Sequence, residues 1–98
     1  MASKFPIDSA VVSWQDSAGV HIRVYWSDGY TVKERCCDPD SGWTDGAFSQ
    51  AGADVSATSW QADGGVSIRV YCTFEDQSTE WCVDSGSADW YQGAFTLG

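Results

Sequence analysis

The chain is built from two copies of one sequence pattern. Shifted by 46 positions, the second copy matches the first through an SWQ block, an IRVY run and, after one inserted residue, a GAF block. The matched pairs are Asp8/Asp54, Ser13–Gln15/Ser59–Gln61, Ile22–Tyr25/Ile68–Tyr71, Glu34/Glu80, Cys36/Cys82, Asp38/Asp84, Trp43/Trp90 and Gly46–Phe48/Gly93–Phe95. Repeats of about 40 to 50 residues occur in propellers, arrays and solenoids, so the structure inside one copy decides the architecture. We expect one domain over residues 1–98, with copies at about 8–50 and 54–98.

The sequence pattern of each copy predicts four short strands, because β-branched and aromatic residues cluster in four runs that are separated by Gly, Pro, Asp and Ser. The expected strands are Val11–Trp14, Val20–Trp26, Thr31–Cys37 and Trp43–Ser49, followed by Ala57–Trp60, Val66–Cys72, Ser78–Val83 and Trp90–Thr96. No segment keeps the apolar period of a helix, so the sequence predicts an all-β fold with almost no helix.

Four antiparallel strands per copy match a propeller blade. Propellers close with about four to eight blades, and two blades alone would expose an apolar face and a sheet edge. The sequence therefore predicts assembly, with a homotrimer of two-blade chains completing a six-bladed β-propeller. Two chains would give a four-bladed ring and four chains an eight-bladed one. A monomeric sandwich of all the strands is the alternative.

The acidic composition restricts the partners. Fourteen Asp and Glu against five Lys and Arg give a net charge of −9 and a pI of about 4.1, which argues against nucleic acid and bare anionic membrane. No window has enough apolar residues for a membrane helix, which argues against direct membrane insertion. Met1–Pro6 lacks the charged start and apolar run of a signal peptide, and the localisation stays open.

The four cysteines are interpreted mainly as buried thiols. Cys36 and Cys37 are adjacent, and no C-x-x-C motif is accompanied by the His pair of a zinc site, since His21 is the only histidine. Free cysteine is among the most buried residue types. We therefore expect thiols that pack inside the protein, and no metal site.

Scarce charges recur at equivalent places in both copies. The chain has three Arg and three Glu, and two of each form the pairs Arg23/Arg69 and Glu34/Glu80. Strand alternation lets Arg23 lie beside Glu34, each holding the other's charge while presenting donors and acceptors outward. A plain cross-strand salt bridge would explain the same pair without a ligand.

A sugar would suit such a pair of charges. Sugar hydroxyls both donate and accept hydrogen bonds, and sugar C–H faces pack on aromatic rings. Trp43 and Trp90 are the repeat-equivalent rings that could serve. Trp14 and Trp60, inside the SWQ blocks, are assigned to packing.

These motifs together resemble a known family. The order SWQ, HIRVY or SIRVY, KERC or TEWC, then GW or DW followed by GAF resembles the fucose-binding lectins of the Aleuria aurantia type, over about Val11–Phe95. It is most similar to their short two-repeat bacterial relatives, such as those of Ralstonia and Burkholderia. The resemblance implies a non-catalytic, multivalent lectin that recognises L-fucose and fucosylated glycans outside cells, without a cofactor. In such relatives three chains form a six-bladed propeller with sugar sites between neighbouring blades.

The resemblance also implies two sugar sites. In each, an Arg, a Glu and the GAF backbone hold hydroxyls, a Trp closes the site, and an apolar pair holds the C6 methyl that separates fucose from hexoses with a hydroxyl there. The first site would use Arg23, Glu34, Gly46, Ala47, Val66, Ile68 and Trp90. The second, between chains, would use Arg69, Glu80, Gly93 and Ala94 with Val20, Ile22 and Trp43 of an adjacent chain.

The sequence departs from the family at two equivalent positions. The family usually has Trp directly after the cysteine of KERC or TEWC, where this chain has Cys37 and Val83. Loss of an aromatic ring removes stacking worth about 0.5–1.5 kcal/mol, so we expect weaker affinity or a changed glycan preference. The loops Pro39–Gly42 and Ser85–Asp89 also look longer than the family norm and should lie near the mouth of the sites.

Two other functions compete with sugar binding. A glycosidase would need two carboxylates about 5 to 9.5 Å apart, whereas each copy offers one Glu beside an Arg, so we expect no enzyme activity. A structural or protein-binding propeller with altered or lost sugar specificity is the alternative, motivated by Cys37 and Val83.

Overall fold

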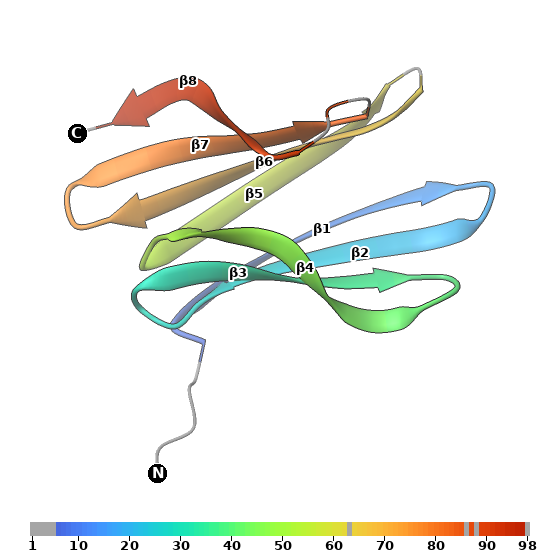
Figure 1. The fold of residues 1–98 in the computed structure, drawn as a ribbon, viewed down its shortest axis with the longest axis horizontal. Coiled ribbons are helices and arrows are strands. Elements are labelled where there is room, and N and C mark those ends of the chain that lie inside the picture. Colours follow the sequence, from blue (N-terminus) through green and yellow to red (C-terminus); the bar gives the residue numbers. More distant parts are fainter. Residues whose placement is uncertain (1–5, 63, 86, 88, 98) are drawn as a thin grey trace, which may run out of the picture.

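Two separate antiparallel sheets make up the protein. The computed structural model describes residues 6–62, 64–85, 87 and 89–97. Blade 1 holds the strands β1 (Asp8–Asp16), β2 (Gly19–Ser27), β3 (Thr31–Asp38) and β4 (Gly42–Ala51), and blade 2 holds β5 (Asp54–Ala62), β6 (Gly65–Phe74), β7 (Gln77–Asp84) and β8 (Tyr91–Leu97). In both, neighbours in the sheet are neighbours in the chain (Figure 1). The predicted all-β fold with two four-stranded blades is confirmed.

The observed strands are longer than the predicted ones, with one exception. Trp90 was expected to begin the last strand, but β8 begins one residue later, at Tyr91. The reason is that the Trp90 ring packs across the gap onto blade 1, at 4.7 Å from the ring of Phe48. Of the two loops expected near the sites, Pro39–Ser41 joins β3 to β4. The other, Ser85–Asp89, lies partly outside the described residues.

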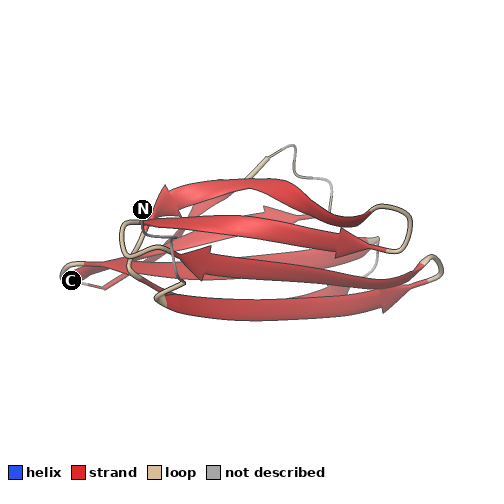
Figure 2. Ribbon diagram, turned by 90° about the horizontal axis from the view of Figure 1, so that it is seen from below, coloured by secondary structure: helices blue, strands red, loops and turns tan. Residues whose placement is uncertain are grey.

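The two blades lie side by side as a thin slab. The molecule measures 40 × 36 × 18 Å, and Figure 2 shows it along the slab with strands and connecting loops only. The first strands of the blades, β1 and β5, form the most extensive contact between the sheets. Within the described ranges, no helix is long and apolar enough to cross a membrane.

The hydrophobic core is the seam between the blades. Strand alternation turns one face of each sheet toward the other sheet, and these two faces supply the buried cluster. Blade 1 contributes Val12, Tyr25, Val32 and Phe48, and blade 2 contributes Val55, Ile68, Val70 and Cys72. The opposite face of each sheet remains uncovered in a single chain. It exposes Val11 and Val20 on blade 1, and Trp60 and Phe95 on blade 2.

The connection between the blades fixes the seam. Gly52 is buried there, its N–H donates to the Tyr30 carbonyl at 2.9 Å, and its carbonyl accepts from the Ser27 hydroxyl at 2.7 Å. A Cβ on Gly52 would approach a Val32 methyl to 2.8 Å and the Cys72 Cβ to 3.0 Å. The linker therefore passes directly over Cys72, which leaves room only for a small side chain.

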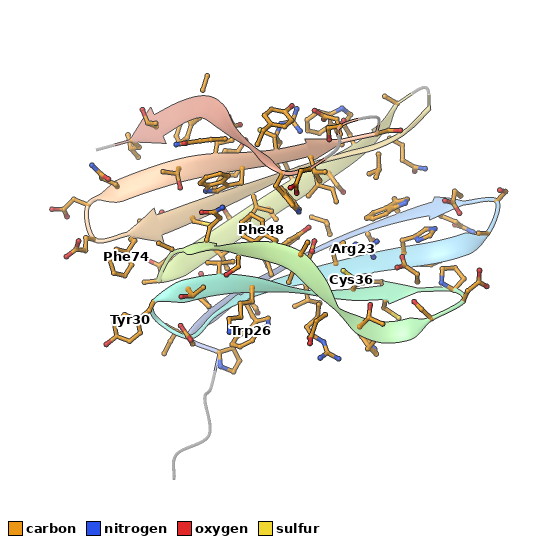
Figure 3. All side chains as sticks on the ribbon, viewed as in Figure 1. Arg23, Trp26, Tyr30, Cys36, Phe48 and Phe74 are labelled. Atoms are coloured by element: carbon orange, nitrogen blue, oxygen red, sulfur yellow. The ribbon has the colours of Figure 1, made fainter. Side chains whose placement is uncertain are left out.

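This packing explains a difference between the copies. Cys72 stands where the first copy has Trp26, and Cys72 is buried under the linker. Figure 3 shows Trp26 on the other side of blade 1, away from blade 2, whereas Phe48 points into the seam. The linker at Gly52 lies against Cys72, whereas the larger Trp26 ring lies on the opposite side of blade 1.

Candidate functional site

A bulge in the last strand of each blade creates a place for a carboxylate. In blade 1, Lys33 pairs with Ser49 and Arg35 pairs with Asp45, so the three residues Gly46–Phe48 stand opposite Glu34 alone. Blade 2 has the same irregularity, with the GAF residues of β8 opposite Glu80. Bulges of this kind often lie beside functional sites, because they redirect the backbone and free its polar groups.

The two glutamates are held by equivalent partners. Glu34 is buried; its Oε2 accepts from the Tyr25 hydroxyl at 2.8 Å, and its Oε1 accepts from the Phe48 N–H at 3.4 Å. Glu80 accepts from the Tyr71 hydroxyl at 2.8 Å and from a backbone N–H of the GAF block at 3.2 Å. The bond from Tyr71 and the backbone N–H groups lower the pKa of Glu80. Both glutamates are therefore fixed acceptors.

The glycine of each GAF block provides the space for this arrangement. A Cβ built on Gly46 would overlap the carboxylate of Glu34, and one on Gly93 would overlap that of Glu80. The glycine thus permits close approach of the glutamate to the backbone, a role that no other residue can fill.

We expect Gly46→Ala to displace the Glu34 carboxylate and to abolish ligand binding at this place. Loss of the Tyr25 bond to a buried carboxylate should also lower the free energy of unfolding by about 1–3 kcal/mol. Denaturant titration and calorimetric ligand titration of the variant measure the two effects. Gly93→Ala is the matched control, since it changes only the second copy. If the Gly46→Ala variant bound the ligand as well as the unchanged protein does, the position of Glu34 would be irrelevant to binding.

Each arginine is paired with an aspartate. Arg23 Nη1 donates to Asp38 Oδ1 at 2.9 Å, and Arg69 Nη1 donates to Asp84 Oδ1 at the same distance. The expectation that Arg23 and Glu34 hold each other is wrong. In the sheet register, Arg23 pairs with Cys36, so Glu34 and Asp38 are equally far from it along β3. Arg23 binds Asp38, which lies at the end of the strand.

A tryptophan ring packs against the guanidinium of each arginine. The guanidinium carbon of Arg23 lies 4.9 Å from the centre of the Trp14 ring, and Arg69 lies equally far from Trp60. Cation–π contact of this kind favours a flat, fixed guanidinium. The assignment of Trp14 to packing is therefore incomplete, because its ring supports Arg23 and lines the site. Trp60 is exposed rather than packed in a core.

All seven residues predicted for the first site line one cleft between the blades. The cleft has a volume of about 630 Å³, within the range of small-molecule sites. On one side lie Arg23, Glu34 and the backbone of Gly46–Ala47, and on the other lie Val66 and Ile68. Arg23 and Glu34 thus face the apolar Val66 and Ile68, and Asp84 and Ser85 add polar groups on the blade 2 side. Figure 3 shows Arg23 and Cys36 on the side of blade 1 that faces this gap.

Trp90 joins the two walls. It comes from blade 2, lines the cleft, and packs edge-on against Phe48 at 4.7 Å and Tyr25 at 6.0 Å between ring centres. Tyr25 also donates a hydrogen bond to Glu34, so one tyrosine contacts both Trp90 and Glu34. The cleft is therefore preorganised on both sides.

The second predicted site is present only as separate halves. Arg69, Glu80, Gly93 and Ala94 lie on blade 2, where the contacts of Arg69 and Glu80 repeat those of the first site. Trp43 and Val20 belong to blade 1, are each 51% exposed, and line no part of the cleft. Ile22 shares the strand face of Val20, which points away from blade 2. One chain therefore does not bring these seven residues together.

Several residues of the cleft were not predicted. They are Trp14, Asp16, His21, Cys36, Asp38, Gly65 and Asp84, whereas Val83 and the loop residue Ser85 also line the cleft and had been expected at or near the sugar sites. The aspartates carried a usable signal, since Asp38 and Asp84 match between the copies and share the strand face of the glutamates. His21 carried none, because the second copy has Ser67 there.

The cysteines remain unpaired, and half of them are buried. Cys72 and Cys82 lie inside, as expected, whereas Cys36 and Cys37 are partly exposed. Burial raises the pKa of Cys72 to about 12 and, with the nearby Glu34 charge, that of Cys36 to about 11. These thiols therefore stay protonated near neutral pH. Within the described part of the chain, no three His, Cys, Asp or Glu side chains are grouped to hold a metal ion.

Comparison with known proteins agrees with this geometry. One solved structure, a variant of the Aleuria aurantia lectin in complex with α-methyl-L-fucoside, matches with a TM-score of 0.67 and 27% sequence identity. The match covers 89% of this chain and 30% of that one, so the chain spans less than a third of that lectin. Comparison with curated proteins finds no match.

A family model gives the assignment. The model for the fungal fucose-specific lectins matches residues 3–97, nearly the whole sequence. The predicted family is therefore confirmed, while the similarity to its short bacterial relatives stays a prediction. This chain belongs to the fungal fucose-specific lectin family.

Proposed function

We propose that this chain is a non-catalytic lectin that binds L-fucose and fucosylated glycans in the cleft between its two blades. The observation that carries the proposal is the convergence of all seven predicted residues on one cleft, with Arg23 and Glu34 on one side and Val66 and Ile68 on the other. A deoxy sugar has the same two-sided character, since one edge carries hydroxyls and C6 is a methyl group.

The roles follow from the chemistry of each wall. The Arg23 guanidinium offers N–H donors, and the Glu34 carboxylate offers acceptors, so together they suit neighbouring hydroxyls that donate and accept. Val66 and Ile68 would hold the methyl group and leave a C6 hydroxyl without a partner, which disfavours galactose-like hexoses. Trp90 would pack on the C–H face of the ring.

Assembly into a closed ring completes the proposal. The residues on the uncovered face of blade 1 match those on the face of blade 2 that lies in the seam. In the same way, the uncovered face of blade 2 matches the face of blade 1 that lies in the seam. Two chains can therefore join through a copy of the seam that already exists within one chain. Three chains joined in this way give a six-bladed ring, and each joint unites Arg69 and Glu80 with Val20, Ile22 and Trp43 of the next chain. Several sites on one ring would bind glycan-bearing surfaces with avidity.

Trp26 should contribute to the joint between chains. Its equivalent in the seam, Cys72, is small because the linker at Gly52 passes over it, whereas separate chains are not joined by such a linker. We expect Trp26→Cys to raise the dissociation constant of assembly at least about tenfold, as for a typical aromatic interface residue. Sedimentation velocity over a dilution series measures this constant.

Calorimetric titration of the purified protein with α-methyl-L-fucoside tests the proposed function. We expect saturable binding with two sites per chain, and about tenfold or weaker binding of α-methyl-galactoside, because its C6 hydroxyl is left unpaired. A folded, assembled protein that binds no fucoside would contradict the proposal and favour the structural or protein-binding propeller.

A further inference from the structure

The two copies fix their arginines through different partners. Asp38 Oδ1 accepts from Arg23 and also lies 2.6 Å from His21 Nδ1. In the second copy, Asp84 accepts from Arg69 at Oδ1 and from the Tyr91 hydroxyl at Oδ2. The copies do not share these supports. His21 is replaced by Ser67 in the second copy, and Tyr91 corresponds to Thr44 in the first.

His21 is placed between two carboxylates. Its Nδ1 faces Asp38 at 2.6 Å, and its Nε2 faces Asp16 Oδ2 at 3.0 Å. Asp16 is anchored by the Ala18 N–H at 2.9 Å, and the Trp14 ring stacks on the imidazole with a centre distance of 5.1 Å. A neutral imidazole has one N–H donor, so only the imidazolium donates to both carboxylates.

The charged groups near this imidazole come from three strands of blade 1, and one carboxylate of blade 2 lines the same cleft. Asp16 on β1, Arg23 on β2 and Asp38 on β3 surround it, and Asp84 of β7 lines the same cleft. The hydrogen bonds to Asp38 and Asp16 raise the pKa of His21 above its usual 6.5, and they lower the pKa of both aspartates. The bond to Asp84 raises the pKa of Tyr91 above its usual 10. Tyr91 therefore stays protonated at pH values at which His21 has already lost its proton.

We propose that His21 is a positioning residue of the cleft within one chain: its imidazolium fixes Asp38, and Asp38 fixes Arg23 for the sugar. This cleft then binds more weakly once His21 loses its proton, whereas the cleft between chains, supported by Tyr91, keeps its affinity. The inference rests on the proposed sugar binding and adds that the two sites of one chain respond differently to pH.

Calorimetric titration with α-methyl-L-fucoside at about pH 6 and about pH 9 separates the two clefts. Arg69→Ala leaves the cleft within the chain, and Arg23→Ala leaves the cleft between chains. The affinity of the first variant should fall about threefold or more at the higher pH, and that of the second should stay constant, as expected for one weakened charge-assisted hydrogen bond. Adding His21→Ser to Arg69→Ala should weaken binding at the lower pH and remove the pH dependence.

Nuclear magnetic resonance of the imidazole gives a readout that needs no sugar. The His21 ring should titrate above 6.5, and Asp16→Asn should lower its pKa. Added fucoside should raise this pKa further, because binding and protonation are linked. Equal pH profiles in the two clefts, or a His21 pKa at or below the usual value, would overturn the inference while sugar binding stands. Absence of sugar binding at both pH values would instead overturn the proposed function and the inference with it.

Discussion

Arg23→Ala should remove sugar binding from the cleft within the chain and leave the protein folded. The guanidinium is the donor of the polar wall, held 2.9 Å from Asp38 and supported by the Trp14 ring. A hydrogen bond to a charged group contributes about 1.5–3 kcal/mol. Its loss therefore lowers the affinity of this cleft about tenfold to a hundredfold. The calorimetric stoichiometry should then fall from two sites per chain to one.

Arg35→Ala is the matched control for this loss. Arg35 lies on the neighbouring strand and pairs with Asp45 at 2.9 Å, but both side chains are largely exposed and lie outside the cleft. Exposed ion pairs contribute little, so sugar binding in the cleft within the chain should be unchanged. Two intact sites per chain in Arg23→Ala would contradict the assigned role of Arg23.

Phe48→Ala should produce the largest loss of stability. Phe48 is 2% exposed, and its ring packs edge-on against Tyr25 at 5.6 Å and against Trp90. Truncation of a buried phenylalanine costs about 3–5 kcal/mol, because it removes apolar contacts and leaves a cavity. It also withdraws the support of Trp90 and Tyr25, so binding should weaken with it. Urea titration at fixed chain concentration measures the change.

Phe95→Ala extends this prediction to the joint between chains. Phe95 is the equivalent residue of blade 2, packs against Tyr71 at 5.7 Å, and is 45% exposed in a single chain. If a neighbouring chain covers blade 2, this truncation should cost nearly as much as Phe48→Ala. If chains remain separate, Phe95→Ala should lower the free energy of unfolding by well under half as much as Phe48→Ala does. A small effect of Phe95→Ala at high chain concentration would therefore argue against ring closure.

The sequence alone predicts the walls of the cleft well. Repetition and strand alternation single out Arg23 and Glu34, and the family resemblance places Val66 and Ile68 of the next blade opposite them. Repetition also marks Trp90 as a candidate ring, but its assignment to the first site came from the family resemblance, since no local pattern shows that a residue at the edge of a strand will cross to another sheet.

The partners of these side chains were harder to predict. The bulge opposite Glu34 and the register that sets Arg23 across from Cys36 depend on hydrogen bonding between strands, which the sequence does not display. The ion pair with Asp38 was missed for this reason. The difference between Trp26 and Cys72 was equally hidden, because it follows from the path of the linker.

Sedimentation equilibrium at micromolar concentration tests the central idea most directly. A closed ring should sediment as one species with about three times the 10.6 kDa mass of the chain, in which the two uncovered faces of every chain are buried. A folded, stable single chain of 10.6 kDa at the same dilution would contradict it.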